Sequence, residues 1–286
     1  MRMRIPVGLA AAVWLVAPSV VTAAPPPGAL LGQFAQNQLQ NCAAICPYAA
    51  QGVVTVPVGA VTAPLALLQT AAATGDPFRA VGAAARSVTA PADAAMTGII
   101  GNDLNQVVPR FQNGVLIGMV HVLRFADGTG SVDGMRSDLL AALQEPLPPV
   151  APTPPPLTTP PPFAITPAPS GPLQVAAVEA ANAFFAAAFY VPELSLLGAT
   201  QTANAAASTL ASTGDPVAAV RAGANAAGAV ATENAAILER TLTRASAASI
   251  ESPGAGRQSE PPTGSPRESS TGSSVSDDGG VTGAGD

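Results

Sequence analysis

The chain has few residues able to transfer protons or bind metals. His121 is its only histidine, all 12 of its basic residues are arginine, and it contains no lysine. The missing lysine excludes a phosphate-binding P-loop, a Schiff-base lysine and a serine–lysine dyad. His121 lies in an apolar run with no acidic residue close to it in sequence, which favours a buried imidazole over a general base. We therefore predict no catalytic, cofactor-binding or metal-binding residues.

Cys42 and Cys46 are the only cysteines of the chain and are separated by three residues. In an oxidising compartment two cysteines this close pair with each other, so we predict a local disulfide that stiffens one turn. A redox or metal role is the alternative. Redox cysteines are usually separated by two residues, however, and one distant histidine does not complete a metal site. Pro47 predicts that a helix ends near this pair.

Three aspartates offer oxygen ligands at some positions of a calcium-binding loop. They are Asp127, Asp133 and Asp138. Val132 stands where the loop needs its turn glycine, and Asp138 replaces the bidentate glutamate. We interpret the segment as a solvated turn that leads into a helix over residues 135–143.

A four-residue motif, Thr-Gly-Asp-Pro, occurs twice, at 74–77 and at 213–216, each time between two alanine-rich stretches. Glycine takes the left-handed conformation after one helix, aspartate caps the next helix, and proline fills its first position. Each copy therefore predicts a helical hairpin, and we interpret the motif as structural rather than as a binding site. The predicted helix caps are Gly75, Asp76, Pro77, Gly214, Asp215 and Pro216.

The second helix of each predicted hairpin has an apolar face at helical spacing, and we expect that face to pack inward. The face consists of Phe78, Val81, Ala85 and Val88 in the first copy, and of Val217, Val220, Ala224, Ala227 and Ala231 in the second.

The composition favours helices over a core of large rings. Of the 286 residues, 48% are hydrophobic but only 4% are aromatic and 10% are charged, so the apolar surface comes mainly from alanine, valine and leucine. Alanine buries little area and loses no side-chain entropy in a helix, so we predict a mostly α fold with helices packed at close range. The formal net charge of -6 excludes nucleic acid as a partner, because an acidic chain does not neutralise phosphates.

Composition also divides the chain into segments. Arg2 and Arg4 precede an apolar run and small residues before Ala24, the pattern of a cleavable signal peptide, with a retained N-terminal anchor as the alternative. Proline favours an extended spacer, and the glycine, serine and acidic residues near the C-terminus favour disorder. The predicted segments are a signal peptide (1–23), helical module one (28–144), a proline-rich linker (145–172), helical module two (173–251) and a disordered tail (252–286).

Two long apolar runs cover residues 53–73, without any charge, and 174–199, with two glutamates. Pro57 and Pro64 count against a straight membrane span in the first run. We expect both runs to form buried helices, with peripheral contact to an envelope surface as the alternative. The shorter run 114–125 fits a helix or a strand, because periodicity does not separate the two over such a length.

The hairpin motif between alanine-rich helices, together with the absence of lysine, resembles alanine- and proline-rich exported proteins of mycobacteria. Segment 58–102 is similar to helical segments in the C-terminal parts of PE and PPE family proteins. The Pro-Glu and Pro-Pro-Glu motifs that name those families are absent from the N-terminus, where the predicted signal peptide stands instead. The resemblance implies a secreted or cell-envelope location and no known activity.

These observations predict a non-enzymatic exported protein that acts at the cell envelope by packing its helices against a protein or lipid partner, without a cofactor. One alternative is a secreted enzyme that uses scattered carboxylates on cell-wall polymer. Another is a lipid carrier that holds its ligand between alanine-lined helices.

Overall fold

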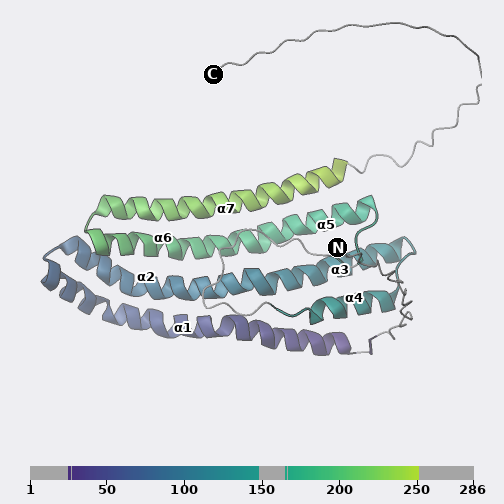
Figure 1. The fold of residues 1–286 in the computed structure, drawn as a ribbon, viewed down its shortest axis with the longest axis horizontal. Coiled ribbons are helices and arrows are strands. Elements are labelled where there is room, and N and C mark those ends of the chain that lie inside the picture. Colours follow the sequence, from purple (N-terminus) through teal and green to yellow (C-terminus); the bar gives the residue numbers. More distant parts are fainter. Residues whose placement is uncertain (1–24, 27, 148–164, 166, 251–286) are drawn as a thin grey trace, which may run out of the picture. The chain divides into compact units, whose positions relative to one another are not determined.

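The computed structural model of the chain describes residues 25–26, 28–147, 165 and 167–250 (Figure 1). This part of the chain is mostly helical and contains no strand, which confirms the predicted fold class at that level. The predicted signal peptide, most of the predicted linker and the predicted tail lie outside the described residues.

The described helices form five continuous rods. The first is α1 (Ala29–Thr74), the third is α4 (Val132–Gln144) and the fifth is α7 (Pro216–Ile250). The second rod consists of α2 (Pro77–Asn102), the π-helical segment η1 (Asp103–Val107) and α3 (Val108–Ala126). The fourth rod consists of α5 (Pro172–Phe185), the π-helical segment η2 (Ala186–Tyr190) and α6 (Val191–Thr213). The run 114–125 is therefore helical.

The long helices pack side by side in the order α1, α2, α6 and α7 (Figure 1). The two hairpins that contain the repeated motif thus meet through α2 and α6. The shorter helices complete the other end, where α4 packs on α1 and α3, and α5 packs on α3 and α7. The row therefore has two edge helices, α1 and α7.

Small residues line the contacts within this row. A Cβ at Gly59 of α1 would overlap the carbonyl group of Ser87 in α2, and a Cβ at Gly82 of α2 would overlap the backbone of Ala211 in α6. A Cβ at Gly198 of α6 would crowd a side chain of α7. Alanine-rich helices gain dispersion contacts only when their backbones come close, and these glycines permit that approach.

The faces predicted to pack inward in α2 and α7 point outward, so that prediction was wrong. Val88 alone among the predicted positions is partly buried. The exposed ones are Phe78, Val81, Ala85, Val217, Val220, Ala224, Ala227 and Ala231. The positions buried against neighbouring helices are small: Ala80, Gly82, Ala219 and Gly223. Because the backbones approach closely, each helix packs through the face that has small residues, although its opposite face is more apolar.

Helix α1 differs from expectation in two ways. It continues through Pro47, Pro57 and Pro64, so the helix end predicted near Pro47 was wrong. All three prolines are exposed, and packing along α2 stabilises the helix across the hydrogen bonds that proline cannot donate. The run 53–73 was expected to be buried, yet most of its large side chains are exposed.

The main hydrophobic core lies where the second and fourth rods meet around η1 and η2. Its buried members are Ile100, Leu104, Val108, Phe185, Ala186, Tyr190, Leu194, Leu197 and Ile237. A second, smaller cluster joins α3 to α5 through Leu116, Val120 and Val178. Large side chains are thus buried mainly near the π-helical segments, while small residues hold the remaining length of the row.

This difference in burial predicts that alanine substitutions at two adjacent residues lower the free energy of unfolding by very different amounts. Phe185 is 2% exposed and Phe184 is 61% exposed. We expect Phe185→Ala to lower the free energy of unfolding by about 3–5 kcal/mol, because it opens a cavity in the main core. Phe184→Ala serves as the control and should cost less than about 1 kcal/mol. Urea-induced unfolding followed by circular dichroism measures both, and equal losses would contradict this placement of the core.

Candidate functional site

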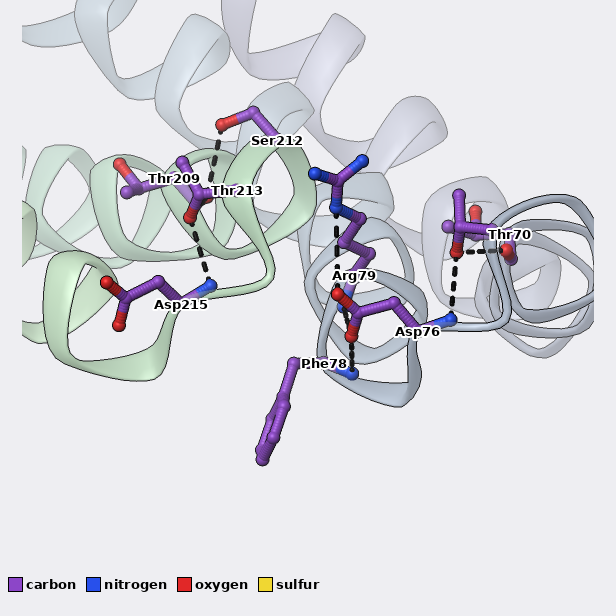
Figure 2. A network of polar contacts seen from close by, with 9 residues as sticks. Thr70, Asp76, Phe78, Arg79, Thr209, Ser212, Thr213 and Asp215 are labelled. Carbon is purple, nitrogen blue, oxygen red and sulfur yellow. Dashed lines mark hydrogen bonds and ion pairs between the residues drawn. The ribbon is translucent and has the colours of Figure 1, made fainter.

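The two Thr-Gly-Asp-Pro turns have the same internal hydrogen bonds. In both, the backbone N–H of the aspartate donates to Oγ1 of the threonine two residues earlier (Figure 2). Oδ1 of Asp76 accepts from the backbone N–H groups two and three residues later, at 2.8 and 3.2 Å, and Oδ1 of Asp215 does the same at the same distances. Gly75 and Gly214 have φ values of 68° and 72°. α2 and α7 begin at the prolines that follow. The six predicted cap residues therefore end one helix and begin the next in both copies.

The two turns also touch each other, which the sequence did not indicate. A Cβ at Gly214 would overlap Oδ2 of Asp76. Nε of Arg79 lies 3.7 Å from the same oxygen, and the second copy has Ala218 in the corresponding place. Gly214 is therefore required for its positive φ and also for the space that Asp76 occupies. Asp76 and Asp215 both accept hydrogen bonds from the backbone of their own turns, as expected for a structural motif.

Three glycine-to-alanine variants separate these two requirements. Gly75→Ala meets open space, so it should cost only the left-handed backbone penalty of about 1–2 kcal/mol. Gly214→Ala has that penalty and the overlap with Asp76, and we expect a larger loss in the free energy of unfolding. Gly228→Ala is the control, because this helical glycine meets nothing within 4 Å and should stabilise α7 by about 1 kcal/mol. Urea denaturation gives all three values, and equal effects at Gly75 and Gly214 would rule out the contact between the turns.

The predicted cysteine pair is joined in the structure. Cys42 and Cys46 form a disulfide within α1, and the described residues contain no free cysteine. The described residues also contain no group of three or more His, Cys, Asp or Glu side chains able to hold a metal ion.

His121 is buried in α3 and has an acidic partner on α4. Its Nε2 lies 2.9 Å from Oδ2 of Asp138, while its Nδ1 is buried with no hydrogen-bond partner among the described residues. The sequence did not suggest this pair, because the two residues are 17 positions apart and meet only when α4 folds back along α3. The pair ties two helices together, and burial of the ring keeps it away from an external substrate.

The segment considered as a calcium loop is a hydrogen-bonded turn. Oδ1 of Asp127 accepts from the backbone N–H of Thr129 at 3.0 Å and from its hydroxyl at 2.5 Å. These bonds hold the pKa of Asp127 below its ordinary value. Nε2 of Gln174 donates to the other carboxylate oxygen at 3.4 Å. The carboxylate is therefore engaged in the turn and in its contact with α5.

Two partly buried carboxyl groups that lie far apart in sequence, those of Asp103 and Glu193, affect each other's pKa. Asp103 begins η1 and Glu193 lies just after η2. Burial raises the pKa of Asp103, and burial together with the neighbouring Asp103 raises the pKa of Glu193 to about 8. The only clue in the sequence is a Val-Pro pair directly after each π-helical segment, at 108–109 and 191–192.

Buried amides and a tyrosine extend this polar interior between α3 and the fourth rod. Nε2 of Gln112 donates to Oδ1 of Asn182 at 2.9 Å, and the hydroxyl of Tyr190 donates to Oε1 of Gln112 at 3.3 Å. Burial, and then the charges of Glu193 and Asp103, raise the pKa of Tyr190. The tyrosine thus stays neutral and donates a hydrogen bond from the fourth rod to the second.

Exposed aliphatic side chains are concentrated on α1, a helix of 46 residues without a single charged side chain. Its outward side chains from 53 to 68 form what we call the α1 stripe: Val53, Val54, Val58, Val61, Leu65 and Leu68. Val61 is 80% exposed and Leu68 is 65% exposed. Two described stretches, Ala29–Thr74 and Pro172–Thr213, are long and apolar enough to cross a membrane.

A second apolar feature is a groove between α3 and the α5–η2 segment, with a volume of about 680 Å³. We call it the phenylalanine groove, because four phenylalanines line it with Val115 and Met119. They are Phe111, Phe184, Phe185 and Phe189, and the rings of Phe185 and Phe189 stack with centroids 5.3 Å apart. Alanines of α5 complete the lining, so the groove offers no polar side chain to a ligand.

No protein-family model matches the chain, and no curated protein or solved structure matches it either. The resemblance to helical segments of PE and PPE proteins therefore stays a prediction.

Proposed function

We propose that this chain is a non-enzymatic exported protein that acts at the cell envelope, where it attaches to a lipid surface through the α1 stripe. The observation that carries the proposal is an edge helix with no charged residue whose aliphatic side chains face away from the rest of the protein. The signal-peptide pattern at residues 1–23 supports export.

The energetics of the stripe favour removal from water. Each valine or leucine that leaves water contributes about 1.5–3 kcal/mol, and six such side chains lie along one face. Large exposed apolar patches mark surfaces that bind a membrane or a protein. Because α1 has no charged side chain, burial of its outward face does not include the cost of removing a charge from water.

The composition of the stripe favours lipid over a protein partner. Protein interfaces concentrate their binding energy in tryptophan, tyrosine and arginine. The α1 stripe contains only valine and leucine, which an acyl phase accepts without complementary polar groups. We place α1 on the surface rather than across the bilayer, because it packs along α2, which carries Arg79, Arg86 and Asp93.

We propose a non-enzymatic role because the chain has few groups suited to proton transfer. The only histidine is buried against Asp138, and the chain has no lysine. The phenylalanine groove supports the lipid carrier as a second candidate, because its apolar lining suits a single acyl chain. Co-purifying lipid, identified by mass spectrometry of the isolated protein, would favour the carrier.

The proposal predicts that charge on the α1 stripe weakens attachment to lipid. The probe is a phosphatidylcholine vesicle. Binding is measured by flotation of the protein from which only the predicted signal peptide, residues 1–23, has been removed. We expect the double variant V61E/L68E to weaken binding at least about tenfold, because two aliphatic anchors are lost and two charges would enter the acyl phase. Circular dichroism confirms that the variant remains helical.

The matched control is V220E/L242E, which adds the same two charges at exposed apolar positions of the other edge helix, α7. This variant should float like the parent protein. Because the chain is acidic, anionic lipid should weaken binding rather than strengthen it. A parent protein that fails to float, or equal losses in the two double variants, would contradict attachment through α1.

A further inference from the structure

No described helix covers the outward face of α7, which forms one edge of the row (Figure 1). The large side chains on this face are Val217 and Val220 near the start of the helix and Leu242 near its end, and all three are exposed. The positions between them on the same face are exposed alanines: Ala224, Ala231 and Ala235. An exposed apolar face of this length marks a surface for a partner.

Two opposite charges lie beside this apolar face. Glu239 follows Arg221 by roughly five helical turns, so both side chains project from the same side of α7. Both are exposed, and neither has an ion-pair partner within the part of the chain that the structure describes. A partner that covers the apolar face therefore meets a positive charge near one end of it and a negative charge near the other.

A second copy of α7 in antiparallel orientation is complementary to this arrangement. When two identical helices pair antiparallel about a two-fold axis, residues on one flank of a helix meet residues on the same flank of its partner. With the axis at the level of residue 230, Arg221 of each copy lies opposite Glu239 of the other. In the same register Leu242 of each copy lies opposite Val217 and Val220 of the other, and the alanines meet at the centre.

We propose that two copies of this protein associate through an antiparallel pair of α7 helices, with Arg221 and Glu239 forming two ion pairs across the interface. The central alanines let the two backbones come close, as small residues do between α1, α2 and α6 within one copy. The association removes the exposed side chains of Val217, Val220 and Leu242 from water, which supplies its main driving force. The charges set the orientation of the pair.

Two other occupants of this face are less complementary to it. In a parallel pair Arg221 of one copy would lie at the level of Arg221 of the other, and the two Glu239 side chains would be placed in the same way. An acyl phase would accept the aliphatic side chains, but Glu239 beside them would lose water without gaining a cation. The α7 face differs in this respect from the α1 stripe, because α1 has no charged side chain.

The size of this interface predicts a reversible dimer. From Val217 to Leu242 the face is about 38 Å long, and a helix is about 10 Å wide, which gives roughly 400 Å² for each copy. Stable complexes bury about 800 Å² on each partner. We therefore expect a dissociation constant of about 10–100 µM. Well below that concentration the protein is monomeric, so flotation and urea unfolding carried out there measure properties of the monomer.

Sedimentation velocity of the protein without residues 1–23, over a concentration range that brackets this dissociation constant, tests the pair. The parent protein should change from monomer to dimer as its concentration rises. R221E places two carboxylates opposite each other and should raise the dissociation constant at least about tenfold. R221E/E239R exchanges the two charges and should restore association. R244E makes the same charge change at an exposed position on another side of α7, and this control should associate like the parent.

V220E/L242E tests the apolar contacts independently of the ion pairs and should stay monomeric over the whole range, with circular dichroism to confirm that it is folded. A parent protein that remains monomeric, or equal losses in R221E and R244E, would overturn the proposal. So would a V220E/L242E dimer, or an R221E/E239R protein that does not associate. Loss of vesicle flotation by V220E/L242E would assign the face to lipid instead. Because association is measured without lipid, its failure would leave attachment through α1 standing.

Discussion

The close approach of helix backbones is the constraint on which this structure depends. With alanine as the main apolar residue, each position contributes little contact area, so the helices must be long and must lie near one another. Gly59 and Gly82 mark the points where neighbouring backbones approach too closely for a side chain, and Gly198 leaves room for Val230 of α7. The side-by-side order of α1, α2, α6 and α7 is built from such contacts.

This mode of packing determines where the large apolar side chains lie. Narrow spaces between helices admit glycine and alanine, so valine, leucine and phenylalanine are placed either in the region of η1 and η2 or on the outside. The main core takes the first group, with Phe185 and Leu104 among its most buried members. The large apolar side chains on the outside form the α1 stripe and line the phenylalanine groove. An apolar exterior is thus a consequence of how the interior is packed.

Local hydrogen bonding explains which features the sequence predicted well. The caps at Asp76 and Asp215 depend on residues two and three positions away, so the motif contains all that is needed to place them. The helical nature of the chain follows from composition in the same way. The spacing of Cys42 and Cys46 likewise indicated their pairing.

The register between distant helices explains what the sequence did not predict. Periodicity marks the most apolar face of a helix, whereas packing here selected the smallest face, so Phe78 and Val217 were assigned to the wrong side. The pairs of His121 with Asp138 and of Asp103 with Glu193 form only after rods fold against each other. Neither pair has a local pattern that distinguishes it from solvated charge.

The contact between Gly214 and Asp76 makes the two copies of the motif structurally unequal. A duplicated segment ordinarily leaves each copy able to drift on its own. Here the first aspartate is partly covered by the second turn, whereas Asp215 remains exposed to solvent. A side chain at position 214 is therefore excluded by a residue of the other hairpin, so the two turns are not interchangeable.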